Sequence, residues 1–183
     1  MSANEELKSL VMGLFPEMDL IKDEELKEKT IACWIEAIEF RGWTEELLRN
    51  IPFTLLVKNV KIGFIDHVRA CVRMSVACDE VLDEIHGKNK TPVNRNYLVS
   101  GALLADVGKL LEFEIIDGKP NKSDYGKHIR HPFSGVGLAF KHKLPSEVMH
   151  MIATHSKEGA GEKRLPESII FHHTDFIDFD LVC

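Results

Sequence analysis

Apolar residues recur every three or four positions along most of the chain, which is the spacing of one face of an α-helix. Pro16, Gly42 and Gly87 stand where three of these periodic segments stop, and both residue types end helices readily. The segment after Gly42 begins at Thr44, whose side chain is a good N-terminal cap. The pattern predicts helices over residues 4–14, 23–41, 44–49, 64–85, 94–111, 132–141, 145–155 and 167–180.

A short interruption of the helical pattern lies near the middle of the chain. Phe113–Ile116 has the residue types of a strand, and Asp117 and Gly118 follow as a tight-turn pair. The length of 183 residues suits one domain with a full hydrophobic core. We therefore expect an all-α helical bundle, with one small β-hairpin near residues 112–124.

Composition and charge narrow the classes of partner. The chain is 44% apolar and 28% charged, as in ordinary globular proteins. Its net charge of −6 comes without a basic patch, which argues against nucleic acid, whereas a small anionic substrate held by a metal ion is compatible. No apolar run reaches the roughly 18 to 20 residues of a membrane span, and the first residues lack the features of a signal peptide. We expect a cytoplasmic protein that contacts no membrane.

The four cysteines show no paired spacing of the kind that zinc sites use. Cys71 and Cys78 lie two helical turns apart on an apolar face, while Cys33 and Cys183 lie far from them in the sequence. Reduced core thiols are therefore favoured over disulfides or metal ligands.

The segment Ala102–Lys109 is an apolar helix that contains a carboxylate, Asp106, and a lysine three residues later. Residues with this spacing lie on the same side of a helix, so both side chains can point into one cavity. Such a charge pair indicates a functional site, and a structural ion pair at a helix end is the alternative.

Histidines are numerous, nine in all, and most lie near the ends of predicted segments, where side chains can converge on a cleft. One histidine on an apolar face is usually a hydrogen-bonded core residue. Imidazole and carboxylate together, however, suit zinc, manganese, iron or nickel better than magnesium. One or two divalent transition metal ions are the expected cofactor.

The segment Ala102–Lys109 resembles the signature helix of the HD-domain superfamily of metal-dependent phosphohydrolases, which reads alanine-leucine-leucine-histidine-aspartate-isoleucine-glycine-lysine. Ala105 stands where the histidine of that signature would be. The resemblance covers roughly residues 60–180 and implies one HD-like domain over residues 1–183, with N-terminal packing helices over 1–55 and a metal-site core over 60–180. The remaining positions of the family pattern occur in the same order, at His67, His128 and His131, His155, and Asp175.

The resemblance also implies roles for these residues. His67, Asp106 and Asp175 would bind a first metal ion, with Ala105 in place of the fourth ligand. Asp106 would bridge to a second ion held by two of three histidines, for which His131 and His155 are preferred and His128 competes with either. Lys109 would contact the substrate phosphate and, with Asp106, take part in catalysis. Arg130 and Arg69 are further candidates for binding the substrate anion.

Three residues near Asp175 have less defined roles. Asp178, one helical turn later, is either an exposed charge or a hydrogen-bond partner of the site. His172 or His173 could orient Asp175, as metal sites commonly need.

The implied function is hydrolysis of a small phosphate ester or nucleotide by a metal-bound hydroxide. Two alternatives stay open: a di-iron oxygenase of the same architecture, and a degenerate domain that only binds or regulates. Ala105 itself has three explanations, namely a natural variant with a different metal or chemistry, a degenerate site, or an engineered substitution. The sequence leaves the substrate and the oligomeric state open.

Overall fold

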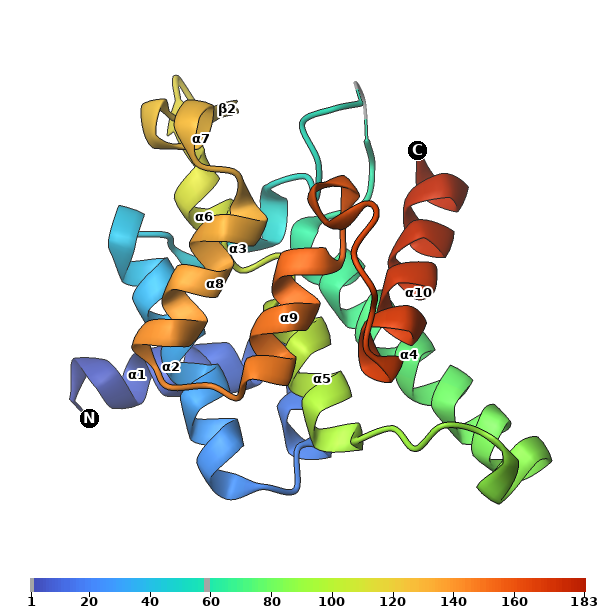
Figure 1. The fold of residues 1–183 in the computed structure, drawn as a ribbon. Coiled ribbons are helices and arrows are strands. Elements are labelled where there is room, and N and C mark those ends of the chain that lie inside the picture. Colours follow the sequence, from blue (N-terminus) through green and yellow to red (C-terminus); the bar gives the residue numbers. More distant parts are fainter. Residues whose placement is uncertain (1, 58–59) are drawn as a thin grey trace.

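A computed structural model describes residues 2–57 and 60–183, which form a bundle of helices with one small hairpin (Figure 1). The all-α prediction is confirmed. The α-helices are α1 (Ala3–Leu14), α2 (Glu24–Arg41), α3 (Glu45–Asn50), α4 (Phe64–His86), α5 (Arg95–Leu104), α6 (Lys109–Glu112), α7 (Asp124–His128), α8 (His131–Lys141), α9 (Ser146–Thr154) and α10 (Pro166–Val182). The strands are β1 (Phe113–Ile116) and β2 (Lys119–Lys122), and the 3₁₀ helices are η1 (Pro16–Leu20), η2 (Gly87–Asn89) and η3 (Lys157–Gly159).

Capping residues fix some of the helix ends that the sequence predicts. The side chain of Asp23 accepts a hydrogen bond from the backbone N–H of Leu26 at the start of α2, and Thr44 caps α3 in the same way. Gly42 ends α2 in the left-handed region, with φ of 66°, which a residue with a Cβ adopts only at a cost.

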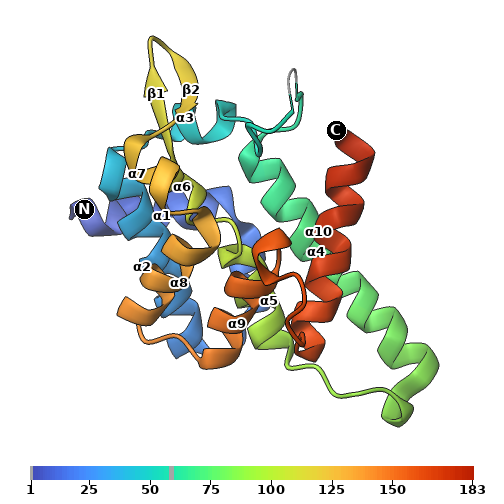
Figure 2. The same ribbon diagram turned by 45° about the horizontal axis from the view of Figure 1, so that its top comes forward.

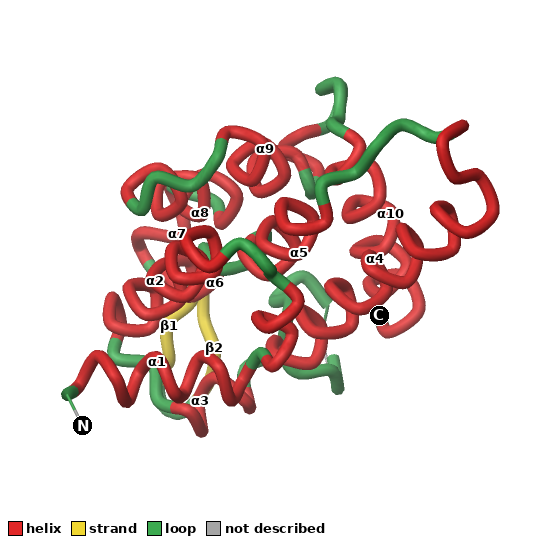
Figure 3. The backbone as a smooth tube through the Cα atoms, turned by 90° about the horizontal axis from the view of Figure 1, so that it is seen from below, coloured by secondary structure: helices red, strands yellow, loops and turns green. Residues whose placement is uncertain are grey.

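The predicted hairpin is present. Strands β1 and β2 pair antiparallel, with Phe113 opposite Lys122 and Ile116 opposite Lys119. Asp117 and Gly118 both have positive φ, as a type I′ hairpin turn requires. The hairpin projects from the bundle beside α3 (Figure 2), and it is a minor element among the helices (Figure 3).

The predicted helix over residues 94–111 is wrong in one respect, because the structure divides it into α5 and α6. Backbone hydrogen bonds at the division span three residues instead of four, as from Lys109 N–H to the carbonyl of Asp106. Gly108 lies at the division, where a Cβ would collide with the carbonyl oxygen of His131 and the hydroxyl of Ser134. The turn thus lets α8 approach closely and places Asp106 between two helices.

Helix α5 lies at the centre of the bundle and packs against α2, α4, α9 and α10. Its apolar side chains join a core that contains Trp34, Phe15 and Phe64, all buried. The Trp34 indole N–H donates to the carbonyl of Leu103 in α5. Polar side chains gather where α5 ends. No helix within residues 2–57 and 60–183 is long and apolar enough to cross a membrane.

Candidate metal centre

A cavity of about 580 Å³ opens beside the turn that carries Asp106. Cavities for small ligands commonly hold about 300–1,000 Å³. Its lining combines acids and imidazoles, cationic side chains, and apolar side chains, many of them aromatic. The acids and imidazoles are Asp106, Glu112, Glu158, Asp175, His67, His131 and His155. The cationic side chains are Lys109, Lys122, Arg130 and Lys157. The apolar side chains include Phe53, Leu55, Leu56, Phe113, Phe176 and Phe179.

Asp106 is at the centre of the polar cluster and is 4% exposed. Its Oδ2 lies 3.2 Å from Nε2 of His67 and 2.7 Å from Nζ of Lys109. Its Oδ1 faces the other way, 3.3 Å from Nε2 of His131 and 3.5 Å from Nε2 of His155. The two oxygens of one carboxylate therefore face two different sets of side chains.

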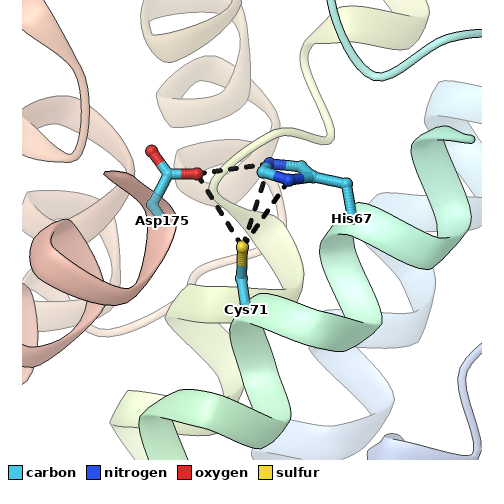
Figure 4. A group of neighbouring side chains, drawn as sticks. All are labelled: His67, Cys71 and Asp175. Carbon is cyan, nitrogen blue, oxygen red and sulfur yellow. Dashed lines mark hydrogen bonds and ion pairs between the residues drawn. The ribbon is translucent and has the colours of Figure 1, made fainter. Parts of the chain in front are cut away.

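Two groups of possible metal donors meet at Asp106, and we call them the first and second donor groups. The first comprises His67, Cys71 and Asp175, which converge from α4 and α10 (Figure 4). Within it, His67 Nε2 lies 3.2 Å from Asp175 Oδ1. The second comprises Asp106 with His131 of α8 and His155 at the end of α9. Either group could hold a metal ion, and Asp106 could bridge them.

Each histidine is oriented by a partner on its far nitrogen. Nδ1 of His67 lies 2.6 Å from a carboxylate oxygen of Asp178, and Nδ1 of His131 lies 3.1 Å from Glu112. Nδ1 of His155 donates to the carbonyl of Ile152 at 2.8 Å. These contacts turn all three Nε2 atoms toward Asp106. Metal-binding histidines show this arrangement, with one nitrogen on the ion and the other held by an acceptor.

The second donor group also needs positive charge between its members. Nδ1 of both His131 and His155 faces an acceptor, so in the neutral rings both Nε2 atoms carry lone pairs. These atoms lie 3.2 Å apart and both face the Asp106 carboxylate. A proton or a cation between them relieves the repulsion. The donor atoms therefore suit a divalent transition metal ion.

The pKa shifts around the first donor group also favour a bound cation. Burial lowers the pKa of His67, but hydrogen bonds with Asp106, Asp175 and Asp178 outweigh burial and hold that pKa well above its ordinary value. Burial raises the pKa of Asp106, yet the Lys109 ammonium and the histidine contacts bring it well below its usual range. A buried group of three carboxylates around one imidazole favours a bound cation.

The second donor group contains histidines of two kinds. Burial lowers the pKa of His131 to about 4, against the opposing hydrogen bond with Glu112. Burial also lowers the pKa of His155, but contacts with Asp106 more than compensate and leave it raised. Burial raises the pKa of Glu112, but contacts with His131 and Arg130 outweigh burial and lower that pKa to about 2. Glu112 is thus ionised when it orients His131.

The structure does not bring all the predicted site residues together. Asp106 and Lys109 form the expected ion pair across the turn instead of along one helix. His128 is exposed at the end of α7 and does not line the cavity, so the geometry favours His131 over it. Arg130 lines the cavity and pairs with Glu112 and Glu158. Arg69 lies outside the lining and pairs with Glu17 at 3.1 Å.

Other residues of the site were missed or left undecided. The sequence allowed Asp178 to be either an exposed charge or a hydrogen-bond partner of the site, and the structure shows it as the hydrogen-bond partner of His67. His172 contacts the carbonyl of His155 and not Asp175. Glu112 was missed, although a charge in an apolar helix was the signal that singled out Asp106. Phe53 was also missed; its ring stacks on His67 with centroids 4.3 Å apart.

The chain is similar to a dihydroneopterin 2′,3′-cyclic phosphate phosphodiesterase from Methanocaldococcus jannaschii. The two are 30% identical over an alignment of 169 residues that covers 86% of this chain. The chain spans 64% of the length of that relative. No family model matches the chain, and no solved structure matches it.

Proposed function

We propose that this protein is a metal-dependent phosphohydrolase of the HD-domain superfamily that opens a small organic cyclic phosphate to a phosphomonoester. The observation that carries the proposal is the convergence of three anchored imidazoles on the two oxygens of Asp106, beside a ligand-sized cavity. The relative from Methanocaldococcus jannaschii, a cyclic phosphate phosphodiesterase, supports the choice of substrate class.

Five residues would hold the metal. His67 and Asp175 would bind one ion, His131 and His155 a second, and Asp106 both. When bound, such a pair of ions polarises a phosphoryl oxygen and lowers the pKa of a coordinated water molecule. We expect divalent transition metal ions because the donors are imidazole nitrogens and carboxylate oxygens.

Lys109 would bind the phosphate of the substrate. Its ammonium lies 2.7 Å from Asp106 Oδ2 and 5.6 Å from the centre of the Phe53 ring, and it lines the cavity. It is therefore a positive point charge fixed beside the proposed reaction centre. Arg130, which Glu112 and Glu158 hold in place, adds charge to the lining.

The apolar part of the lining would take the organic part of the substrate. Phe53, Phe113, Phe176 and Phe179 contribute aromatic surface to the same cavity. Flat organic groups bind well to such surfaces, since aromatic contacts add to the burial of apolar area. Phe53 also stacks on His67, so a substrate that binds against Phe53 would lie next to the ring that orients a proposed metal donor.

The test is an assay of metal-loaded protein against 2′,3′-cyclic nucleotides, phosphomonoesters and nucleotides. We expect hydrolysis of a cyclic phosphate that stops when the metal is chelated and returns when it is restored. Absence of hydrolysis across the panel, with metal bound, would overturn the phosphohydrolase assignment. In that case, oxygen consumption by iron-loaded protein would favour the oxygenase alternative. No oxygen consumption would favour a domain that only binds or regulates.

A further inference from the structure

Helix α8 lies at the surface of the bundle and exposes an aromatic stripe (Figure 1). Phe133, Gly137 and Phe140 follow one another at intervals of four and three residues, so they share one face of the helix. Phe133 is 59% exposed and Phe140 is 73% exposed. The opposite face is in the core, where Leu138 and Ala139 are buried. Helix α8 thus buries one apolar face in the bundle and leaves a second one open to solvent.

Neighbouring elements extend this stripe. Helix α2 packs beside α8, and Phe40 lies one helical turn after Glu36, whose carboxylate is 2.8 Å from Lys141 Nζ of α8. The Phe40 ring lies against Tyr125 of α7, with centroids 5.8 Å apart. Phe40, Tyr125 and Ile129 are each more than a third exposed. We call this surface the α8 face; it comprises Phe40, Tyr125, Ile129, Phe133, Gly137 and Phe140.

The area of the α8 face matches the apolar part of a homodimer interface. With about 200 Å² for a whole large side chain, the exposed fractions of its five large residues give about 500 Å². A stable dimer buries about 800 Å² on each partner, of which about 65% is apolar. The α8 face therefore provides nearly all the apolar area that one protomer needs.

The charges around the α8 face also permit self-association. Two copies of a chain with a net charge of −6 repel each other, so a shared interface should lack free carboxylates. Helix α8 contains no acidic residue, and Glu36 at its edge pairs with Lys141 and His142. The exposed Leu181 of α10, by contrast, lies beside Asp180. The α8 face is the better suited of these two surfaces.

We propose that a second copy of this chain covers the α8 face, with the two α8 helices antiparallel across a two-fold axis at Gly137. Such an interface is self-complementary, because each residue meets its counterpart across the axis. Along the helix, Phe133 lies about 6 Å before Gly137 and Phe140 about 4.5 Å after it. The axis therefore sets Phe133 of each copy against Phe140 of the other. A Cβ added at Gly137 would meet no atom of the described chain within 4 Å, so the glycine leaves room for close approach. The inference is independent of the metal centre.

The mass of the native protein in solution is the first test. Sedimentation equilibrium should give twice the chain mass of 20.8 kDa. Phe140→Glu brings like charges to the axis, and we expect the dimer dissociation constant to rise at least about 30-fold, as on loss of an aromatic hot spot. Leu181→Glu, exposed on α10, is the matched control and should leave the dimer intact. A native monomer at every concentration measured, or an intact dimer in Phe140→Glu, would overturn the inference.

Gly137→Leu tests the crossing point and should not harm the fold. Leucine has a higher helix propensity than glycine, and its Cβ would enter open space in the protomer. In the dimer the added side chain would hold the helices apart, so we expect the dissociation constant to rise about 10-fold. Circular dichroism checks the fold. An unchanged dimer in Gly137→Leu would overturn the packing at Gly137, and a dimer lost only in Leu181→Glu would overturn the inference and place the interface on α10.

Discussion

The two donor groups around Asp106 differ in how many of the metal ligands of the family pattern they contain. The second presents His131 and His155, each anchored on its far nitrogen, to one oxygen of Asp106. The first has Ala105 where the family pattern places a histidine, and Cys71 lies beside its remaining donors. The comparison teaches that two donor groups that meet at one carboxylate need not be equally complete.

The largest expected effect belongs to Asp106, which both groups share. Asp106→Asn keeps the shape of the side chain but removes the charge that would bridge two ions, so both should be lost. Hydrolysis should fall by more than about 10²-fold, the usual cost of losing a single electrostatic contact in a catalytic site. Metal content per chain and turnover measure this. Asp66→Asn, exposed in α4, is the matched control. Full metal content in Asp106→Asn would show that it is not a bridge.

Substitution within the second donor group should remove one ion and spare the other. We expect His131→Ala to reduce bound cobalt from two ions per chain to one. His128→Ala tests the competing histidine and should leave cobalt content unchanged, because His128 is exposed at the end of α7. Elemental analysis with absorption spectra measures both. Loss of metal in His128→Ala alone would reverse the assignment.

Ala105→His should improve the first donor group modestly. Because the imidazole would add a donor at the position where the family pattern has one, we expect a gain in cobalt affinity of about 10-fold. Ala105 is 0% exposed, so the added ring should also cost about 1–3 kcal/mol of stability. Ala105→Leu controls for bulk and should cost stability without raising affinity. Cobalt titration and thermal unfolding separate the two effects, and an unchanged affinity in Ala105→His would contradict a ligand position at residue 105.

Acidification should empty the first donor group before the second. A group whose pKa is raised must give up a proton when metal binds, so its affinity falls as pH drops below that pKa. This applies to His67, whose pKa lies well above its ordinary value. In the second group it applies to His155, whereas His131, with a pKa of about 4, stays unprotonated. Cobalt retained at successive pH values should fall in two steps, with the upper step from the first donor group. A single step would contradict the difference between the groups.

The smallest effect is expected at Arg69, a candidate for substrate binding that lies outside the cavity lining. Its partly exposed ion pair with Glu17 should contribute at most about 1 kcal/mol. Arg69→Ala should therefore lower the free energy of unfolding slightly and leave KM unchanged. Denaturant unfolding and steady-state kinetics check this, and a raised KM would return Arg69 to the site.

Local signals in the sequence predicted much of the fold. Thr44 and Gly42 fix helix ends through bonds and backbone angles that involve only near neighbours, and Asp117 and Gly118 specify the hairpin turn for the same reason. The division between α5 and α6 was missed because it depends on a long-range contact. The backbone of α8 approaches Gly108 there, which no local pattern reveals.

The site was predictable in part for a similar reason. The positions of His67, Asp106 and Asp175 follow a family order, and the structure brings these three residues together. His128 and His131 could not be separated from sequence, because both lie near the ends of short segments. Cys71 was predicted to be a reduced core thiol, and the structure has it buried and free.

The metal content of the native protein tests the central claim most directly. After incubation with zinc or ferrous iron and removal of the excess, elemental analysis should find two ions per chain, because Asp106 faces a donor group with each of its oxygens. Protein that retains no ion under these conditions would contradict the account.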